Sequence, residues 1–337
     1  MDEQTVLMQR ALDAALLGPE ADPNPRVGCV VTGRDGTVVG VGHHRGAGTP
    51  HAEVDALQQA GEAARGGTAY VTLEPCDHTG RTGPCSQALL AAGVARVRYA
   101  VADPMPGAAG GAATLAAAGV DVAAGPLTDA AEAVNRTWLA ALRTGRPFVT
   151  WKCATTLDGR TAAADGTSRW ITGPAARADV HALRARVGAV LVGTGTALTD
   201  DPALTVRDAG GRVVGRQPLR VVLGDRPLPD GARLLDGTAE TLHVRGRDPH
   251  AALAAVRDRG VHHVLLEGGP TLAAAFLRAG LVDEVVAYVA PVLLGEGPGA
   301  VAGLGVGTIS EALRLHTTDV AVLGGDVRIT ARPVTRS

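Results

Sequence analysis

One histidine, one glutamate and two cysteines are spaced so that they could build a catalytic zinc site. His51-Ala52-Glu53 is followed by Glu74-Pro75-Cys76 and then by Gly83-Pro84-Cys85. An imidazole nitrogen and two thiolates supply three protein ligands and leave a fourth tetrahedral position for water, as in catalytic zinc sites. Glu53 is not needed as a ligand and could carry protons for the reacting water. This pattern is typical of zinc deaminases that act on amino-substituted heterocycles.

The spacing of the two cysteines needs an explanation, because eight residues separate Cys76 from Cys85, whereas the compact motif has two. A longer loop can return both thiolates to one metal if Cys76 ends a strand and Cys85 opens the next helix, and Pro84 suits a helix entrance. The alternative is a surface histidine with two small buried hydrophobes. The ordered set, with its prolines and Glu53, favours the metal site.

Composition excludes some classes of function. A length of 337 residues predicts two domains of ordinary size. The formal net charge of −2 leaves no basic face for a phosphate backbone, and 2% aromatic residues are too few for base-stacking platforms. We therefore expect a small-molecule substrate and no nucleic-acid partner.

The cysteines and the apolar runs predict a cytoplasmic protein. Cys29, Cys76, Cys85 and Cys153 show no disulfide-rich spacing, and the amino terminus lacks the features of a signal peptide. Gly, Arg and Asp interrupt every apolar run, so we expect no membrane span. Cys29 and Cys153 lie in apolar, strand-like segments and are expected to be packing residues. We also expect a homo-oligomer.

The first half alternates between helical and strand patterns. A helix is expected at 4–17, and paired strands at 27–31 and 38–41 flank an Asp35-Gly36 turn. A helix at 52–64 would carry His51 and Glu53 at its amino terminus, and a strand at 68–73 would lead to Cys76. Further helices are expected at 85–92, 112–118 and 128–142, and further strands at 94–101 and 120–123. This alternation predicts an α/β sandwich with a largely parallel sheet.

Charge, Gly and Pro interrupt the pattern at 143–147, which places the domain boundary between residues 1–145 and 146–337. The second half is again α/β. Strands are expected at 148–154, 189–192, 219–223, 241–244, 261–266, 284–290, 314–323 and 326–331, and helices at 174–186, 249–259 and 270–279.

Two glycine-rich turns in the second half could bind an anion. Glu267-Gly268-Gly269-Pro270-Thr271 lies between a buried strand and a helix, where free amides and the helix dipole suit a phosphate. The same residues could simply form a tight turn. Gly193-Thr194-Gly195-Thr196 is a second such turn. This second turn lacks the third glycine of a Rossmann dinucleotide fingerprint, and Pro298 follows Gly295-Glu296-Gly297, so neither of these two stretches supports a Rossmann site.

Longer strings of residues resemble the bifunctional deaminase/reductase family of riboflavin biosynthesis over nearly the whole chain. In the first half these strings are Asn24-Pro25-x-Val27-Gly28-Cys29-Val30, Pro50-His51-Ala52-Glu53-Val54, Tyr70 to Cys76, and Pro84-Cys85. In the second half they are Leu157-Asp158-Gly159-Arg160, Ser168-x-Trp170-Ile171-Thr172, Asp200 to Arg207, and Glu267 to Leu272. The long cysteine spacing belongs to that family.

The resemblance implies that the first domain is a cytidine-deaminase-like α/β/α sandwich that hydrolytically removes an amino group from a diaminopyrimidinone carrying a phosphoribosylamino group. It implies zinc on His51, Cys76 and Cys85, with Glu53 as the proton carrier. Residues at matching positions would bind the substrate: Asn24, His44 and His78 the base, and Arg81 the ribose phosphate.

For the second domain the resemblance implies a dihydrofolate-reductase-like α/β fold that reduces the ribosyl group to a ribityl chain with hydride from NADPH. Hydride transfer needs mainly positioning and charge stabilisation, so no single nucleophile is expected. NADPH would bind near Ala154, Trp170, Thr196, Asp200, Gly269, Pro270 and Thr271. The substrate would bind near Lys152, Ser168, Arg184, Leu204, Arg207 and Glu267.

The chain departs from the family pattern in two places. Gly83-Pro84 replaces Pro-Pro before the second cysteine, and Asp103-Pro104-Met105-Pro106 replaces Asp-Pro-Asn-Pro, which removes a side-chain amide. Two other functions remain open from the residues alone. One is a zinc deaminase of another free base or nucleoside with a non-catalytic second domain. The other is a zinc-stabilised binding protein, which Glu53 and the open ligand position disfavour.

Overall fold

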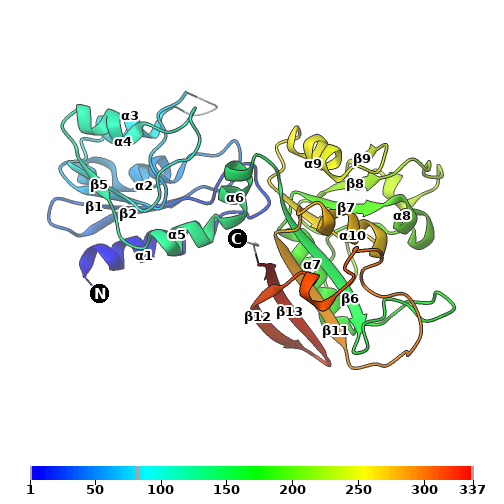
Figure 1. Cartoon of the computed structure of the whole chain (residues 1–337). Coiled ribbons are helices and arrows are strands. Elements are labelled where there is room, and N and C mark those ends of the chain that lie inside the picture. The colour runs from blue at the N-terminus through cyan, green and yellow to red at the C-terminus, as the bar shows by residue number, and fades with distance from the viewer. Residues whose placement is uncertain (1, 80–82, 335–337) are drawn as a thin grey trace. The chain divides into compact units, whose positions relative to one another are not determined.

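The computed structural model describes residues 2–79 and 83–334 (Figure 1). The chain divides into two compact units, Met1–Gly145 and Arg146–Ser337. Gly145 has a φ of 68°, a left-handed conformation that suits glycine, and it ends the last helix of the first unit. Within the described residues no helix has the length and apolarity needed to cross a membrane.

The first unit contains a five-stranded sheet in the order β2-β1-β3-β4-β5. The strands are β1 (Gly28–Thr32), β2 (Val38–His43), β3 (Thr68–Val71), β4 (Arg96–Tyr99) and β5 (Asp121–Ala124). β1 runs antiparallel to both β2 and β3, whereas β3, β4 and β5 are parallel. The expected Asp35-Gly36 hairpin is present, with Gly36 at a φ of 86°. The sheet is therefore mixed and not largely parallel, because the hairpin reverses the chain at one edge.

Helices cover both faces of this sheet, as an α/β/α sandwich requires (Figure 1). Cys29 and Val31 of β1 face one apolar cluster and Val30 faces the other, as the alternation of a strand dictates. On the first face lie α2 (Ala52–Ala60), which continues as a short 3-10 turn (Gly61–Ala64), α3 (Cys85–Ala91) and α4 (Gly111–Ala117). On the second face lie α1 (Glu3–Ala15), α5 (Thr128–Val134) and α6 (Arg136–Thr144).

The single helix expected at 128–142 is two helices, because Asn135 interrupts it. The backbone N–H of Arg26 donates to Asn135 Oδ1 at 2.8 Å, and Asn135 Nδ2 donates to the Arg26 carbonyl at 2.8 Å. This pairing with a distant loop holds Asn135 at a φ of −111°, outside the helical range. The interruption depends on a contact between residues 109 positions apart.

Two glycines let helices lie directly on the sheet. A Cβ atom at Gly28 would lie 1.9 Å from the carbonyl oxygen of Ala11 in α1, and one at Gly42 would lie 2.3 Å from that of Ala52 in α2. Any side chain at these positions would push the helix away. Gly42 therefore sets the position of the amino terminus of α2.

The second unit contains an eight-stranded sheet in the order β12-β13-β11-β6-β10-β7-β8-β9. The six strands from β11 to β9 are parallel, and β13 and β12 add an antiparallel edge. The strands are β6 (Phe148–Thr156), β7 (Ala189–Gly193), β8 (Leu219–Leu223), β9 (Thr241–Val244), β10 (His263–Leu266), β11 (Glu284–Ala290), β12 (Leu315–Leu323) and β13 (Asp326–Pro333). This matches the predicted α/β class.

Two pairs of helices cover this second sheet. α9 (Pro249–Arg257) and α10 (Pro270–Arg278) pack on one face, and α7 (Pro174–Ala185) and α8 (Thr194–Asp200) on the other. Short 3-10 turns lie at Arg233–Leu235 and Ile309–Glu311. The predicted turn at residues 193–196 is a strand-to-helix junction, since β7 ends at Gly193 and α8 begins at Thr194. Cys29 and Cys153 pack against apolar clusters, as predicted.

Candidate active sites

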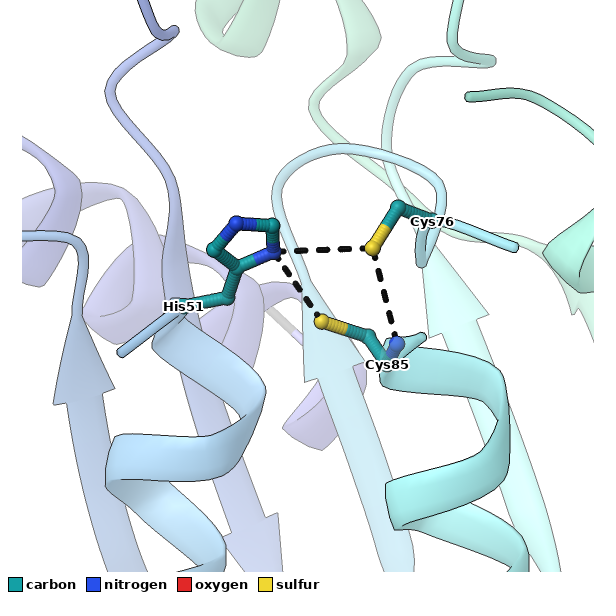
Figure 2. Close-up of side chains that lie close together, drawn as sticks. All are labelled: His51, Cys76 and Cys85. Carbon is teal, nitrogen blue, oxygen red and sulfur yellow. Dashed lines mark hydrogen bonds between the residues drawn. The ribbon is translucent and has the colours of Figure 1, made fainter. Parts of the chain in front are cut away.

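In the first unit, three elements bring one imidazole and two thiols together (Figure 2). His51 immediately precedes α2, Cys85 is the first residue of α3, and Cys76 lies in the loop after β3. His51 Nδ1 lies 3.3 Å from Cys85 Sγ and 3.5 Å from Cys76 Sγ. We expected Cys76 to end a strand, but β3 stops at Val71 and a loop leads from there to Cys76.

The donor set and its spacing fit zinc. The ligand atoms of His51, Cys76 and Cys85 all lie within 4.8 Å of one another. Tetrahedral bonds of about 2.3 Å to sulfur and about 2.0 Å to nitrogen would place N and S about 3.5 Å apart, which is the separation that these residues have. The set supplies three ligands, so a fourth position is left for a reacting group.

Hydrogen bonds and burial shift the pKa values of these groups. Hydrogen bonds from Cys85 and His51 lower the pKa of the Cys76 thiol to about 4, so the pair of cysteines holds its negative charge on Cys76. The bond to Cys76 in turn raises the pKa of His51. Glu53 is only 3% exposed, and burial raises its pKa to about 7. A carboxyl group with such a pKa can both accept and release a proton near neutral pH.

A cavity of about 150 Å³ opens beside these residues and brings together most of the predicted deaminase site. Its walls include Asn24, His44, His51, Glu53, Cys76 and His78. Arg81 lies outside the described residues. Sequence reasoning missed the other residues of the wall, which are Pro25, Val27, Leu73, Glu74, Asp103, Met105, Ala108 and Trp138. Trp138 could have been singled out in the sequence as a rare residue type, because the chain has only 3 tryptophans.

His44 has a defined tautomer, which orients Asn24. The Pro50 carbonyl can only accept a hydrogen bond, so His44 Nδ1, at 3.1 Å, carries the proton. In the neutral ring, Nε2 then accepts from Asn24 Nδ2 at 3.0 Å. Within the part of the chain that the structure describes, the Asn24 side-chain oxygen has no donor bonded to it and can accept a hydrogen bond on the cavity wall.

Glu74 fastens the Asp103 loop to the metal-ligand loop. Its carboxylate accepts 3.2 Å hydrogen bonds from the backbone N–H groups of Asp103, Gly110 and Ala112. Glu74 therefore places Asp103 and Met105 on the cavity wall. Met105 stands where the family pattern has an asparagine, so the cavity wall is apolar at this position. These partners lie 29 to 38 residues away in the sequence, which is why spacing gave no sign of them.

In the second unit, a cavity of about 540 Å³ lies at the carboxyl ends of the central parallel strands. This is where ligands bind in open α/β sheets. Ten of the predicted residues line it: Lys152, Ala154, Ser168, Trp170, Arg184, Thr196, Asp200, Leu204, Arg207 and Glu267. Gly269, Pro270 and Thr271 do not line it, but they begin α10, and a Cβ atom at Gly269 would lie 3.6 Å from Thr196 Oγ1.

A largely buried ion pair between Arg184 and Glu267 lines this cavity. Arg184 donates from Nε and Nη2 to the two carboxylate oxygens of Glu267 at 2.6 and 2.9 Å, and Lys152 Nζ lies 4.0 Å from the same carboxylate. Burial opposes ionisation of Glu267, but the charge and hydrogen bonds of Arg184 outweigh it and lower its pKa. Arg184 is thus not a solvated arginine, the default for a helix surface, because Glu267 occupies two of its nitrogens.

The rim of the cavity carries residues that present flat or charged groups. Trp170 is 70% exposed, and the Arg177 guanidinium lies 4.7 Å from the centre of its ring. Arg169 donates to the Asp200 carbonyl at 2.6 Å. Besides Arg177, wall residues that the sequence did not suggest include Thr161, His181, Thr205 and Arg233. His181 could have been suggested by its spacing, because it lies three residues before Arg184 on the same helix face.

Comparison with known proteins places both units. The family model "Cytidine and deoxycytidylate deaminase zinc-binding region" matches residues 1–101, and "RibD C-terminal domain" matches residues 147–329. The Mycobacterium tuberculosis protein named riboflavin biosynthesis protein RibD is 51% identical over 306 residues, 90% of each chain. The Escherichia coli RibD is 42% identical, covering 95% of this chain and 96% of its own. The Acinetobacter baumannii RibD structure is 40% identical, with a TM-score of 0.91 and 99% of each chain covered.

Proposed function

Because this chain belongs to the RibD family of bifunctional riboflavin-biosynthesis deaminase/reductases, we propose a specific pair of reactions and assign residues to each. The first is hydrolytic deamination of 2,5-diamino-6-(5-phosphoribosylamino)pyrimidin-4(3H)-one. The second is reduction of the ribosyl side chain by NADPH, giving 5-amino-6-(5-phosphoribitylamino)uracil. The chain is a zinc-dependent deaminase and an NADPH-dependent reductase, and the alternative of a non-catalytic second domain is not favoured.

The observation that carries the deaminase assignment is the buried Glu53 beside a three-ligand set. His51, Cys76 and Cys85 would hold zinc, which supplies a Lewis acid that activates water. Glu53 would accept a proton from the reacting water and deliver it to the ring nitrogen, and would then carry a second proton from the added hydroxyl to the departing amine. Its pKa of about 7 lets one carboxyl group serve both transfers.

The cavity wall around Glu53 supports the assignment of base-binding residues. Asn24 and His44 would hold the pyrimidine edge, since the hydrogen bond from Asn24 to His44 leaves the Asn24 oxygen free to accept from an amino group. His78 would contact the base from the Cys76–Cys85 loop, and Arg81 would bind the ribose phosphate. Gly83-Pro84 keeps Cys85 at the start of α3 without the second proline.

The assignment of reductase residues rests on the larger cavity. Lys152, Ser168, Arg184, Leu204, Arg207 and Glu267 would bind the substrate, and Ala154, Trp170, Thr196, Asp200 and residues 269–271 would bind NADPH. The Arg184–Glu267 pair keeps a negative charge next to Lys152. A fixed Lys152 ammonium can then stabilise negative charge as hydride reaches the sugar carbon.

Other features of the chain support a cellular location and an oligomeric state. A cytoplasmic location suits a metal site that needs free thiolates, since thiols stay reduced there. A homo-oligomer is supported by the outer strand β12, where Val320 and Val322 are 58% and 74% exposed. Sedimentation velocity on the full chain would show a species of about twice the monomer mass or larger, and a monomer at all concentrations would contradict the oligomer.

Glu53→Gln tests the deaminase assignment. The amide keeps the size of the side chain but cannot carry protons, so ammonia release should fall by about 10²- to 10⁴-fold. Zinc content, measured by metal analysis, should stay near one per chain, because Glu53 is not a ligand. Glu62→Gln, on the surface of the same unit, serves as the matched control. Ammonia release at the wild-type rate by Glu53→Gln would refute the assignment.

A further inference from the structure

A short segment with unusual backbone conformation links α8 to the wall of the larger cavity. Asp201 and Leu204 have φ values of 39° and 49°, in the left-handed region that residues other than glycine rarely adopt. Thr205, which follows, is 1% exposed. Such a backbone persists only when its surroundings hold it, and Thr205 is held through both its carbonyl and its hydroxyl.

Helix α7 holds the backbone carbonyl of Thr205. His181 Nδ1 donates to this oxygen at 3.0 Å, and Arg184 Nη1 donates at 3.2 Å. Because a carbonyl only accepts, the proton of His181 must lie on Nδ1. Thr205 is thereby tied to Arg184, whose other nitrogens bind Glu267.

The side chain of Thr205 meets the arginine two residues later. Arg207 Nε donates to Thr205 Oγ1 at 3.0 Å, and Arg207 Nη1 donates to the Gly211 carbonyl at 2.8 Å. Within residues 2–79 and 83–334, Nη2 bonds to no other group. Two of the three guanidinium nitrogens are thus fixed, and the third remains for a ligand in the cavity that Arg207 lines.

Arg207 combines two fixed nitrogens with one that remains for a ligand, whereas Arg184 has none left and Arg177 and Arg169 each donate one hydrogen bond, to a backbone carbonyl. Arg184 gives all three of its nitrogens to Glu267 and Thr205. Arg177 donates to the Thr172 carbonyl and lies over Trp170. A guanidinium held by two internal bonds loses little freedom when it binds an oxyanion, so its orientation contributes directly to affinity.

We propose that Thr205 is a positioning residue of the reductase site: its buried hydroxyl holds Arg207 so that the remaining N–H groups meet the phosphate of the substrate. This inference rests on the proposed reductase function. It assigns Thr205 a role in substrate affinity and none in hydride transfer. The effect of removing the hydroxyl should therefore fall on the KM for the substrate and not on kcat.

The test uses the full chain with Thr205→Val, which has nearly the same shape and keeps the carbonyl that α7 binds. With the deaminated intermediate and saturating NADPH, KM should rise about 10-fold, the effect of losing one hydrogen bond to a charged group, while kcat changes by less than about 2-fold. Thr205→Ser retains the hydroxyl and should restore KM to within about 2-fold of the wild type. Thr150→Val is the matched control, since it removes a buried hydroxyl that bonds His263 at 2.9 Å and does not line the cavity.

Two further measurements separate this role from a structural one and from the cofactor. In an Arg207→Ala background, Thr205→Val should cause no further rise in KM, because its effect passes through Arg207. The KM for NADPH should stay within about 2-fold of the wild type. An unchanged substrate KM, a change confined to the NADPH KM, or an equal loss in Thr150→Val would overturn the proposal. If the wild type binds the intermediate but does not oxidise NADPH, the reductase function fails instead, and calorimetric Kd values of the variants still decide the role of Thr205.

Discussion

At the residue scale, the two sites treat a buried carboxyl group in opposite ways. Among the residues that the structure describes, Glu53 has no arginine partner, and burial raises its pKa to about 7. The side chain of Glu267 is also largely buried, but Arg184 binds both of its oxygens and lowers its pKa. The first group is suited to proton transfer and the second to a fixed negative charge.

The Glu267 pair predicts a pH dependence of stability. A carboxyl group whose pKa is lower in the folded state stabilises the fold above its unfolded pKa, and this contribution is lost as the pH falls through the folded pKa. The second unit should therefore lose stability below about pH 4.5, the ordinary pKa of glutamate. Hydrogen-exchange mass spectrometry on peptides of β6 and β10 measures this loss.

Glu267→Gln provides the comparison. The variant should be less stable than the wild type at pH 7, by about 3 kcal/mol, because Arg184 is left buried without a charged partner. The difference in protection between the two proteins should stay constant from pH 7 to about pH 5 and shrink as the pH falls from about 4.5 to 3. A difference that stays constant down to about pH 3 would contradict the account.

Residue types and their order in the sequence predicted that His51, Cys76 and Cys85 come together and that Glu53 lies beside them, which the structure shows. Sequence did not reveal the clamp from Glu74 to Gly110 or the bond from Asn135 to Arg26, since both join segments far apart in the chain. It also could not tell that Arg184 is buried. The pattern of residues on a helix does not show that the end of a strand, here the one that carries Glu267, lies against Arg184.

At the element scale, the position of α2 determines the deaminase site, because His51 immediately precedes this helix and Glu53 lies in its first turn. Gly42 of β2 lets α2 approach the sheet. Strands and helices were predictable from periodicity, and the strands at 219–223, 241–244 and 284–290 have the predicted bounds. The close approach of α2 to the sheet could not be predicted from Gly42, since a glycine in a strand has several explanations.

Gly42→Ala should damage the first unit alone. The added Cβ would lie 2.3 Å from the Ala52 carbonyl oxygen, so α2 must shift. We expect a loss of about 1–3 kcal/mol in the stability of this unit, the usual cost of overpacking, and a fall in zinc content and ammonia release.

Reductase kcat with the deaminated intermediate serves as the internal reference for that variant and should be unchanged. Gly107→Ala is a suitable control, because a Cβ there meets no atom within 4 Å. Equal deaminase losses in the two variants would show that the approach of α2 is not the cause.

At the scale of the whole molecule, the chain is two compact units with one cavity of functional interest in each. Length predicted two domains, and the chain divides within the interruption at residues 143–147. The order of the eight strands in the second sheet could not be predicted, because β10 and β11 insert beside β6 from more than 100 residues away. That insertion brings Glu267 next to Lys152.

The central claim is that the two units catalyse successive reactions, and a coupled assay of Glu53→Gln tests it most directly. Ammonia and NADPH are measured together after addition of the diaminopyrimidinone substrate. The wild type should release one ammonia for each NADPH oxidised, whereas Glu53→Gln should do neither. Supplied with the deaminated intermediate, Glu53→Gln should oxidise NADPH at the wild-type rate. Oxidation of NADPH by Glu53→Gln with the diaminopyrimidinone alone, or its failure with the intermediate, would contradict the account.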